Sequence, residues 1–174
     1  MKNILITGVP GSGKSTICSL LKNQGFNAID GLSRNGLMHW VNKTTQSFDQ
    51  YKPDAGFEWL MNHIWKWDEE KLEELINKNS SSPIFICGVA PMERDILSYF
   101  DHIFLLQISK ETMEKRLKER PGDYAFGKAI GEIEYILSWK EIFEKYFMDH
   151  GVEVIDETLP PERVLKRVLF LGGK

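Results

Sequence analysis

The segment from Gly8 to Ser15 contains the residues whose types and spacing point most directly to chemistry. It has the sequence G-V-P-G-S-G-K-S, which matches the pattern G-x-x-x-x-G-K-[ST] in full. The glycines let the backbone turn so that successive N–H groups face an anion, and a helix that begins near Lys14 adds the positive end of its dipole. Lys14 is therefore expected to neutralise phosphate groups, and the Ser15 hydroxyl is expected to ligate Mg²⁺.

A chance glycine-rich turn is the alternative to a phosphate-binding loop. The flanking sequence argues against it, because the apolar run Ile4–Thr7 precedes the motif and a helical pattern follows it. The sequence thus predicts a site for ATP and Mg²⁺. The expected nucleotide contacts of this segment are Gly8, Pro10, Gly11, Ser12, Gly13, Lys14, Ser15 and Thr16.

Short apolar runs of strand length alternate along the chain with longer helical patterns. The expected strands are Ile4–Thr7, Asn27–Ile29, Ile84–Cys87, Ile103–Ile108 and Val152–Ile155. The expected helices are Ser15–Gln24, Phe57–Asn77, Lys110–Arg120, Ile130–His150 and Pro161–Leu171. Apolar strands separated by helices indicate a parallel sheet covered on both faces, so we expect a three-layer α/β/α fold. Ligands of such sheets bind at the carboxyl ends of the strands, where functional side chains are expected.

Asp30 directly follows the second expected strand. A carboxylate at that end of a parallel sheet suits a magnesium site or removal of a proton from an acceptor hydroxyl. A turn aspartate is the alternative, because the next residue is a glycine and Asp-Gly is a common turn pair. The third and fourth expected strands end at Gly88 and Ser109, so neither supplies the magnesium-binding aspartate that is typical of motor ATPases and signalling GTPases.

With these residues the chain resembles the P-loop small-molecule kinases, which include adenylate and other nucleoside monophosphate kinases, shikimate kinase and gluconate kinase. The resemblance covers nearly the whole chain as an order of elements, while only the phosphate-binding loop is specific in sequence. It implies a five-stranded parallel sheet, a short lid and a helical acceptor-binding region. Shikimate-type kinases carry D-x-D after the second strand. Asp30 matches its first position, whereas Leu32 occupies the second, which counts against shikimate as the acceptor.

Arg116 and Arg120 lie four residues apart in the helix expected after the fourth strand, and therefore share one helical face. A segment with a proline and two glycines follows, and residues 116–130 together resemble the lid of adenylate-kinase-type enzymes. The resemblance implies that Arg116 stacks on adenine and that Arg120 reaches the phosphates, roles that a planar guanidinium suits. Lys128 is a further lid candidate. An exposed charged helix is the alternative.

The acceptor is expected to bind within residues 30–80. Arg34 is the best candidate there for gripping an anionic acceptor, with a solvated charge as the alternative. Gly88 would let an acceptor approach the backbone closely, and Arg94 is similar in position to an arginine of nucleoside monophosphate kinases. The region also holds other possible acceptor contacts, which are Ser33, His39, Trp40, Trp59, His63, Trp65 and Trp67. A tryptophan here either stacks on a nucleobase or, as we expect for any single one, packs in the core. The two histidines are expected to be structural, with a catalytic role as the alternative.

Composition excludes several other classes of protein. The chain has 174 residues, of which 42% are hydrophobic and 27% charged, and this indicates a single globular domain. The net charge of −3 argues against a nucleic-acid partner. Neither a secretion signal nor a membrane-spanning run is recognisable, and Cys18 and Cys87 are expected to be buried thiols of a cytoplasmic protein. A monomer or a homodimer is expected.

Two functions are compatible with these features. The first is a kinase that moves the γ-phosphoryl group of ATP·Mg²⁺ to a nucleotide, a nucleoside or a sugar-acid-like metabolite. Lys14 and Arg120 would then stabilise the transferred group, while Asp30 would serve Mg²⁺ and its water or accept the acceptor's proton. The second is an ATPase or regulatory switch that acts on a protein partner. The lid arginines favour the first.

Overall fold

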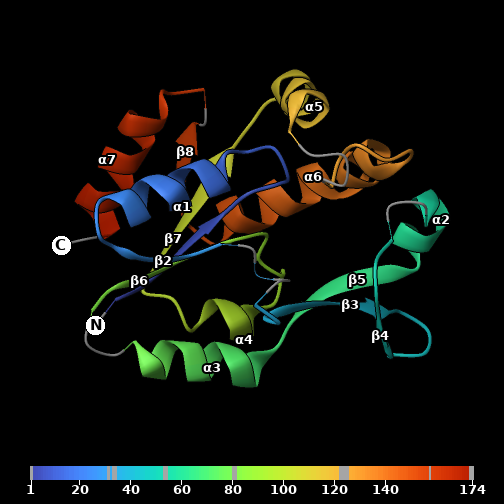
Figure 1. Cartoon of the computed structure of the whole chain (residues 1–174), viewed down its shortest axis with the longest axis horizontal. Coiled ribbons are helices and arrows are strands. Elements are labelled where there is room, and N and C mark those ends of the chain that lie inside the picture. Colours follow the sequence, from blue (N-terminus) through green and yellow to red (C-terminus); the bar gives the residue numbers. More distant parts are fainter. Residues whose placement is uncertain are drawn as a thin grey trace.

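The centre of the molecule is a five-stranded sheet, in the order β2-β6-β1-β7-β8, with all neighbouring strands parallel. The computed structural model describes residues 2–30, 32, 35–52, 55–79, 82–121, 126–156 and 158–172. The strands of the main sheet are β1 (Asn3–Thr7), β2 (Asn27–Ile29), β6 (Ile84–Cys87), β7 (His102–Gln107) and β8 (Glu153–Asp156). The expected five-stranded parallel sheet is thus confirmed (Figure 1).

Helices cover both faces of this sheet, because successive side chains of each strand point to opposite faces. On one face, Ile4 and Ile6 pack with α1 (Lys14–Asn23) and α7 (Pro161–Gly172). On the other face, Leu5 belongs to a larger core that α3 to α6 share. These helices are α3 (Glu69–Lys78), α4 (Arg94–Leu97), α5 (Lys110–Glu119) and α6 (Glu132–Asp149). The fold therefore has the expected three layers.

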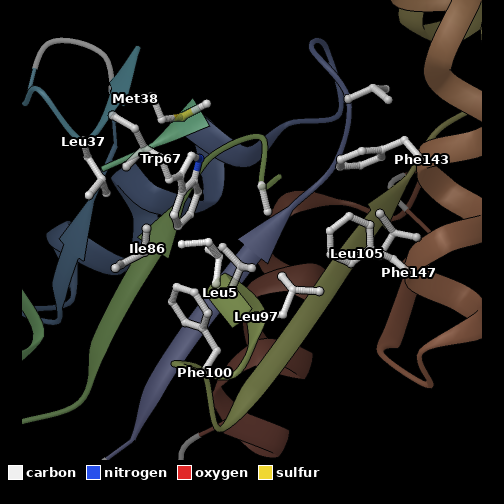
Figure 2. Close-up of a cluster of buried hydrophobic side chains, with 14 of the residues drawn as sticks. Leu5, Leu37, Met38, Trp67, Ile86, Leu97, Phe100, Leu105, Phe143 and Phe147 are labelled. Atoms are coloured by element: carbon white, nitrogen blue, oxygen red, sulfur yellow. The ribbon is translucent and has the colours of Figure 1, made fainter. Parts of the chain in front are cut away.

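The larger core is drawn in Figure 2, where Leu105 of the sheet lies near Phe143 and Phe147 of α6 and Leu5 lies near Leu97. On its other side the same core includes Trp67, which comes from outside the main sheet. Among the described residues, no helix has both the length and the apolar composition that crossing a bilayer requires.

A small antiparallel sheet, in the order β4-β3-β5, lies between β2 and α3 in the chain. Its strands are β3 (Met38–Asn42), β4 (Phe48–Asp49) and β5 (His63–Trp67), and the short helix α2 (Gly56–Met61) precedes β5. The single helix expected over Phe57–Asn77 is therefore wrong, since this stretch forms α2, β5 and α3. The region expected to be helical is instead built largely on this small sheet.

The pattern of burial along β5 explains why this segment is a strand. His63 and Trp67 are buried, while Ile64 and Lys66 are exposed, which is the two-residue period of a strand. Aromatic residues favour strands when they pack against cross-strand neighbours. Trp65 pairs with Trp40 of β3, and their ring centroids lie 4.2 Å apart. The helical pattern resumes only after Asp68, whose side chain caps α3 by accepting a hydrogen bond from the backbone N–H of Lys71.

An aromatic cluster joins the small sheet to α6. Trp40, Leu60 and Tyr135 form its buried centre. The side chains packed around this centre are Tyr51, Trp59, Trp65, Phe126 and Trp139. Trp40 is only 4% exposed, and aromatic pairs of this kind stabilise by about 0.5–1.5 kcal/mol beyond the burial of their area. The small sheet is therefore held firmly against the rest of the molecule.

The carboxylate of Glu132, in the first turn of α6, is a second link between these parts. Glu132 is 2% exposed, and its Oε2 accepts hydrogen bonds from the backbone N–H groups of Gly127 and Ala129 at 2.7 Å each. Its Oε1 accepts a hydrogen bond from the Tyr51 hydroxyl, which lies between β4 and α2. One buried side chain thus fastens both the end of the lid segment and the small sheet to α6.

Candidate functional site

A cleft of about 680 Å³ opens at the carboxyl ends of the main-sheet strands. The phosphate-binding loop, residues 8–15, follows the central strand β1 and supplies its floor. Asp30 comes from the end of β2 at one edge of the sheet. Leu159, Pro161 and Val164 come from the segment after β8 at the opposite edge. A long ligand in this cleft would therefore run across the sheet, with its middle over the phosphate-binding loop.

The phosphate-binding loop has glycine at positions where a side chain would clash with neighbouring atoms or strain the backbone. Gly8 has φ 151°, and a Cβ there would lie 2.6 Å from the Leu106 carbonyl oxygen. Gly13 has φ 94° and precedes α1 as its N-cap, with no side chain that accepts a hydrogen bond from the first turn. The first N–H groups of α1 are therefore left to bind an anion at the positive end of the helix dipole.

Lys14 is the first residue of α1 and turns back over the loop. Its Nζ donates hydrogen bonds to the Val9 carbonyl oxygen at 2.8 Å and to Ser12 Oγ at 3.3 Å. Burial of the ammonium group and the positive charge of Arg120 lower the pKa of Lys14 to about 7, while the negative charge of Asp30 opposes this. The charges of Lys14, Arg120 and Asp30 therefore interact, and a bound anion would favour the protonated form of Lys14.

Proton uptake should accompany nucleotide binding above neutral pH. In the ligand-free protein Lys14 loses its proton as the pH rises through about 7, whereas bound phosphates favour the charged form. Binding must then restore the proton, so the affinity for ADP or ATP should fall by up to about tenfold per pH unit above this pKa. We expect calorimetry at about pH 8, in two buffers of different ionisation enthalpy, to show an uptake that approaches one proton. The nucleotide phosphates are already ionised at that pH.

The control for this prediction is Lys14→Arg, because a guanidinium keeps its proton throughout this range. Nucleotide binding to this variant should take up no proton, even if its affinity is lower. An absence of proton uptake in the unaltered protein, or an equal uptake in Lys14→Arg, would contradict the assignment to Lys14.

Ser15 and Asp30 both line the cleft beside the phosphate-binding loop. A hydroxyl and a carboxylate are hard oxygen donors, and Mg²⁺ commonly binds through one or two such protein groups together with substrate phosphates. The donor set therefore fits the ion expected from the sequence. The Asp30 backbone carbonyl accepts a hydrogen bond from Asn35 Nδ2 at 3.0 Å, which helps to hold the turn after β2.

Arg116 and Arg120 of the expected lid both face the cleft. Arg120 follows the last turn of α5, and its Nη1 donates a long hydrogen bond of 3.4 Å to the Phe126 carbonyl oxygen. Arg120 lines the same cleft as the phosphate-binding loop, and its charge contributes to the lowered pKa of Lys14. Lys128 is exposed, and residues 122–125 lie outside the described part of the chain. The described lid residues thus bring two cations to the site from α5.

Gly88 lies in the cleft wall, but its missing side chain makes room for another residue of the protein. A Cβ at Gly88 would lie 2.1 Å from Leu32 Cδ1, so the space that the glycine leaves is filled by Leu32. The next residue is held from the other side, because Trp67 Nε1 donates a hydrogen bond to the Val89 carbonyl oxygen at 3.1 Å. The small sheet is thereby tied to the segment that follows β6.

An aromatic recess forms the part of the cleft that faces the small sheet. Its residues all line the cleft and pack in or against the larger core, and they are Leu32, Met38, Trp65, Val89, Phe126 and Trp139. The sequence indicated Trp65 as one of several candidates, whereas Met38, Phe126 and Trp139 were not expected as site residues. The alternation of apolar and polar residues over positions 38–40 is typical of a strand and could have indicated Met38 as a residue facing the site. Nothing in the local sequence of α6 indicates that Trp139 lines the cleft.

Other predicted site residues lie elsewhere. Arg94 is exposed in the first turn of α4 and is not among the described residues that line the cleft. Arg34 and Ser33 fall outside the described residues. His63 is buried and is bound by Trp59 and Asp49, at 2.7 Å to the carbonyl oxygen and 3.1 Å to the carboxylate, which is a structural role. Both cysteines, Cys18 and Cys87, are buried free thiols as expected.

Three comparisons place this architecture among known proteins. A dephospho-CoA kinase of Streptococcus mutans is 27% identical in sequence, over 96% of this chain and 98% of the relative. A deoxyadenosine kinase structure from M. mycoides superposes with a TM-score of 0.61 at 18% identity, over 97% of each chain. A gluconokinase structure from Sinorhizobium meliloti gives a TM-score of 0.57 at 18% identity, over 99% of this chain and 94% of the other.

The match to a family model covers most of the chain, not the site residues alone. The model of the AAA domain family matches residues 4–136, which include β1, the phosphate-binding loop, the small sheet and α5. The chain therefore belongs to the AAA domain family, and it has the fold of the P-loop small-molecule kinases.

Proposed function

We propose that this protein is a phosphotransferase that moves the γ-phosphoryl group of ATP to a hydroxyl group of a small molecule. One observation carries the proposal: a single cleft joins the phosphate-binding loop, a carboxylate and two arginines to a recess lined by the small sheet. Its volume of about 680 Å³ leaves room for a second substrate next to the nucleotide. The dephospho-CoA, deoxyadenosine and gluconate kinases named above support transfer to a small acceptor.

In the proposed reaction, the acceptor hydroxyl oxygen forms a bond to the γ-phosphorus of ATP. The bond from that phosphorus to the β,γ-bridging oxygen breaks, and ADP leaves with its electron pair. The proton of the acceptor hydroxyl passes to the Asp30 carboxylate and then to solvent, so that the products are ADP, a phosphomonoester and a proton. Lys14 and Arg120 neutralise the negative charge that spreads over the transferred group, which is the main contribution to catalysis in this chemistry.

Mg²⁺ bound with ATP would neutralise the β- and γ-phosphates. In this proposal Ser15 and Asp30 would hold the ion. Arg116 lies against the adenine, towards the residues that follow β8, and Arg120 closes over the phosphates. Closure of the lid would exclude water, which is needed because water competes with the acceptor for the phosphoryl group. A cytoplasmic location, a monomeric or homodimeric state and the absence of a nucleic-acid partner remain predictions.

The first test is ADP release from ATP·Mg²⁺ against a panel of acceptors. The panel contains nucleosides, nucleoside monophosphates, gluconate, shikimate and other hydroxylated metabolites, with phosphorus NMR to identify the phosphomonoester. We expect slow hydrolysis without an acceptor and a strong, saturable stimulation by one class. A flat panel with intact nucleotide binding would reject the kinase and favour a nucleotide-dependent switch that acts on a protein partner.

A further inference from the structure

The topology of the sheet indicates which end of the cleft would bind the nucleotide and which end would bind the acceptor. β8 lies at one edge of the main sheet and β2 at the other, with β1 between them. The residues after β8 are Leu159, Pro161 and Val164 in the cleft, whereas half of the aromatic recess comes from the segment between β2 and α3. Figure 1 shows α7 and the small sheet on opposite sides of the molecule. The aromatic recess is thus the part left for the acceptor.

Trp65 is an aromatic surface of this recess that is backed by another ring. One side of its indole lies on Trp40, with centroids 4.2 Å apart and planes inclined by 33°. Trp40 is itself surrounded by Tyr51, Trp59 and Tyr135, at centroid distances of 5.4–6.1 Å. A ring that is backed in this way loses little side-chain entropy when a ligand packs on it. Trp65 also lines the cleft, so it offers a prepared surface to a flat group.

Charge is distributed unequally between the two faces of the small sheet. Met38, Trp40 and Trp65 lie on the face towards the recess, whereas His39 and Lys66 pair on the opposite face. The described charged residues of the cleft are confined to the phosphate-binding loop, the end of β2 and α5. They are Lys14, Asp30, Arg116, Glu119 and Arg120. Among the described residues, the recess itself therefore offers apolar and aromatic contacts and no cation for an anionic group.

We infer that the acceptor is an uncharged alcohol with a flat aromatic ring system, of the nucleoside type, whose ring packs on Trp65 in the aromatic recess. This inference rests on the proposed function and names the acceptor class of the same site. Stacking on an aromatic side chain suits any base because every base has a π-face. The hydroxyl group at the other end of such a molecule would extend towards Asp30 and the γ-phosphoryl group. Among the described residues, no cation of the recess would compensate the charge of a phosphorylated or carboxylated acceptor.

The decisive experiment compares acceptors of different charge, ring and accepting group. Deoxyadenosine, deoxycytidine, deoxyguanosine and thymidine are each measured against their own 5′-monophosphates, with gluconate and shikimate as non-aromatic acids. We expect the best nucleoside to exceed its monophosphate and both acids in kcat/KM by about 100-fold or more, since an unpaired buried charge is strongly rejected. Turnover with gluconate, shikimate or a monophosphate instead would leave the kinase intact and overturn this inference. No turnover with any acceptor would reject the proposed function itself.

Variants of neighbouring residues in β5 test the packing surface. Trp65→Leu removes the π-face and should raise the KM for the nucleoside by about 10- to 100-fold, with the KM for ATP unchanged. Trp65→Phe keeps a ring and should retain most of the affinity. Lys66→Ala, on the opposite face of the same strand, is the control and should alter neither constant. An unchanged nucleoside KM in Trp65→Leu would overturn the assignment. Thermal unfolding and ATP binding verify that the variants fold.

Discussion

Replacement of Lys14 by alanine should abolish phosphoryl transfer. The ammonium group lies over the phosphate-binding loop, bonded to Val9 and Ser12, and no other described cation of α1 lines the cleft. Loss of a charge that stabilises the transferred group lowers kcat by at least about 10³-fold in this chemistry. We expect acceptor-dependent ADP release to fall to the background rate at saturating ATP, which can be measured with a coupled assay.

Lys22→Ala is the matched control for this variant. Lys22 is an exposed lysine in the last turn of the same helix, α1, and does not line the cleft. It should retain normal kcat and KM values, so that a loss confined to Lys14→Ala reports the site rather than the helix. Near-normal turnover in Lys14→Ala would exclude its role in transfer.

Asp30→Asn should separate catalysis from nucleotide binding. Asparagine keeps the size of the side chain but cannot accept the acceptor's proton, and it is a weaker ligand for Mg²⁺. General-base catalysis contributes about 10²- to 10⁴-fold, so kcat should fall within that range while ATP affinity changes little. Single-turnover kinetics together with nucleotide titration measures the two effects separately.

Two further measurements sharpen the test of Asp30. A role in magnesium binding would raise the concentration of Mg²⁺ needed for half-maximal rate, whereas a role as base alone would leave that concentration unchanged. Asp95→Asn, an exposed carboxylate in α4, is the control for removal of one negative charge. A kcat within a few fold of normal in Asp30→Asn would rule out both roles.

The main sheet was predictable because its central strands, β1, β6 and β7, are largely buried and therefore stand out as continuous apolar runs. Ile84–Cys87 was predicted to the residue, α1 differs from expectation by one residue at each end, and α7 differs by one residue at its C-terminal end. The small sheet was not predictable in the same way. Leu60, Ile64, Leu72 and Leu75 have near-helical spacing, and that pattern hides the two-residue alternation of β5.

The site residues that could be predicted are those marked by the sequence next to them, whereas those brought to the cleft by packing could not. The phosphate-binding loop and Asp30 follow strands directly, so the rule that ligands bind at the carboxyl ends of strands was enough to find them. Trp139 reaches the cleft only because α6 packs beside the sheet and the aromatic cluster, contacts that are made by residues far apart in sequence. Gly88 shows the same limit, since its packing against Leu32 depends on the pairing of β2 with β6.

Glu132 has a consequence for how the cleft can open. Tyr51 and the backbone of Gly127 and Ala129 share its one buried carboxylate, so neither can move away without leaving that group short of a partner. Leaving a buried group without its hydrogen-bond partner is unfavourable by about 1–3 kcal/mol, which makes the separated state rarer by a factor of roughly 5 to 160. The aromatic cluster and residues 127–129 are therefore expected to move together whenever the cleft opens, because one carboxylate joins both to α6.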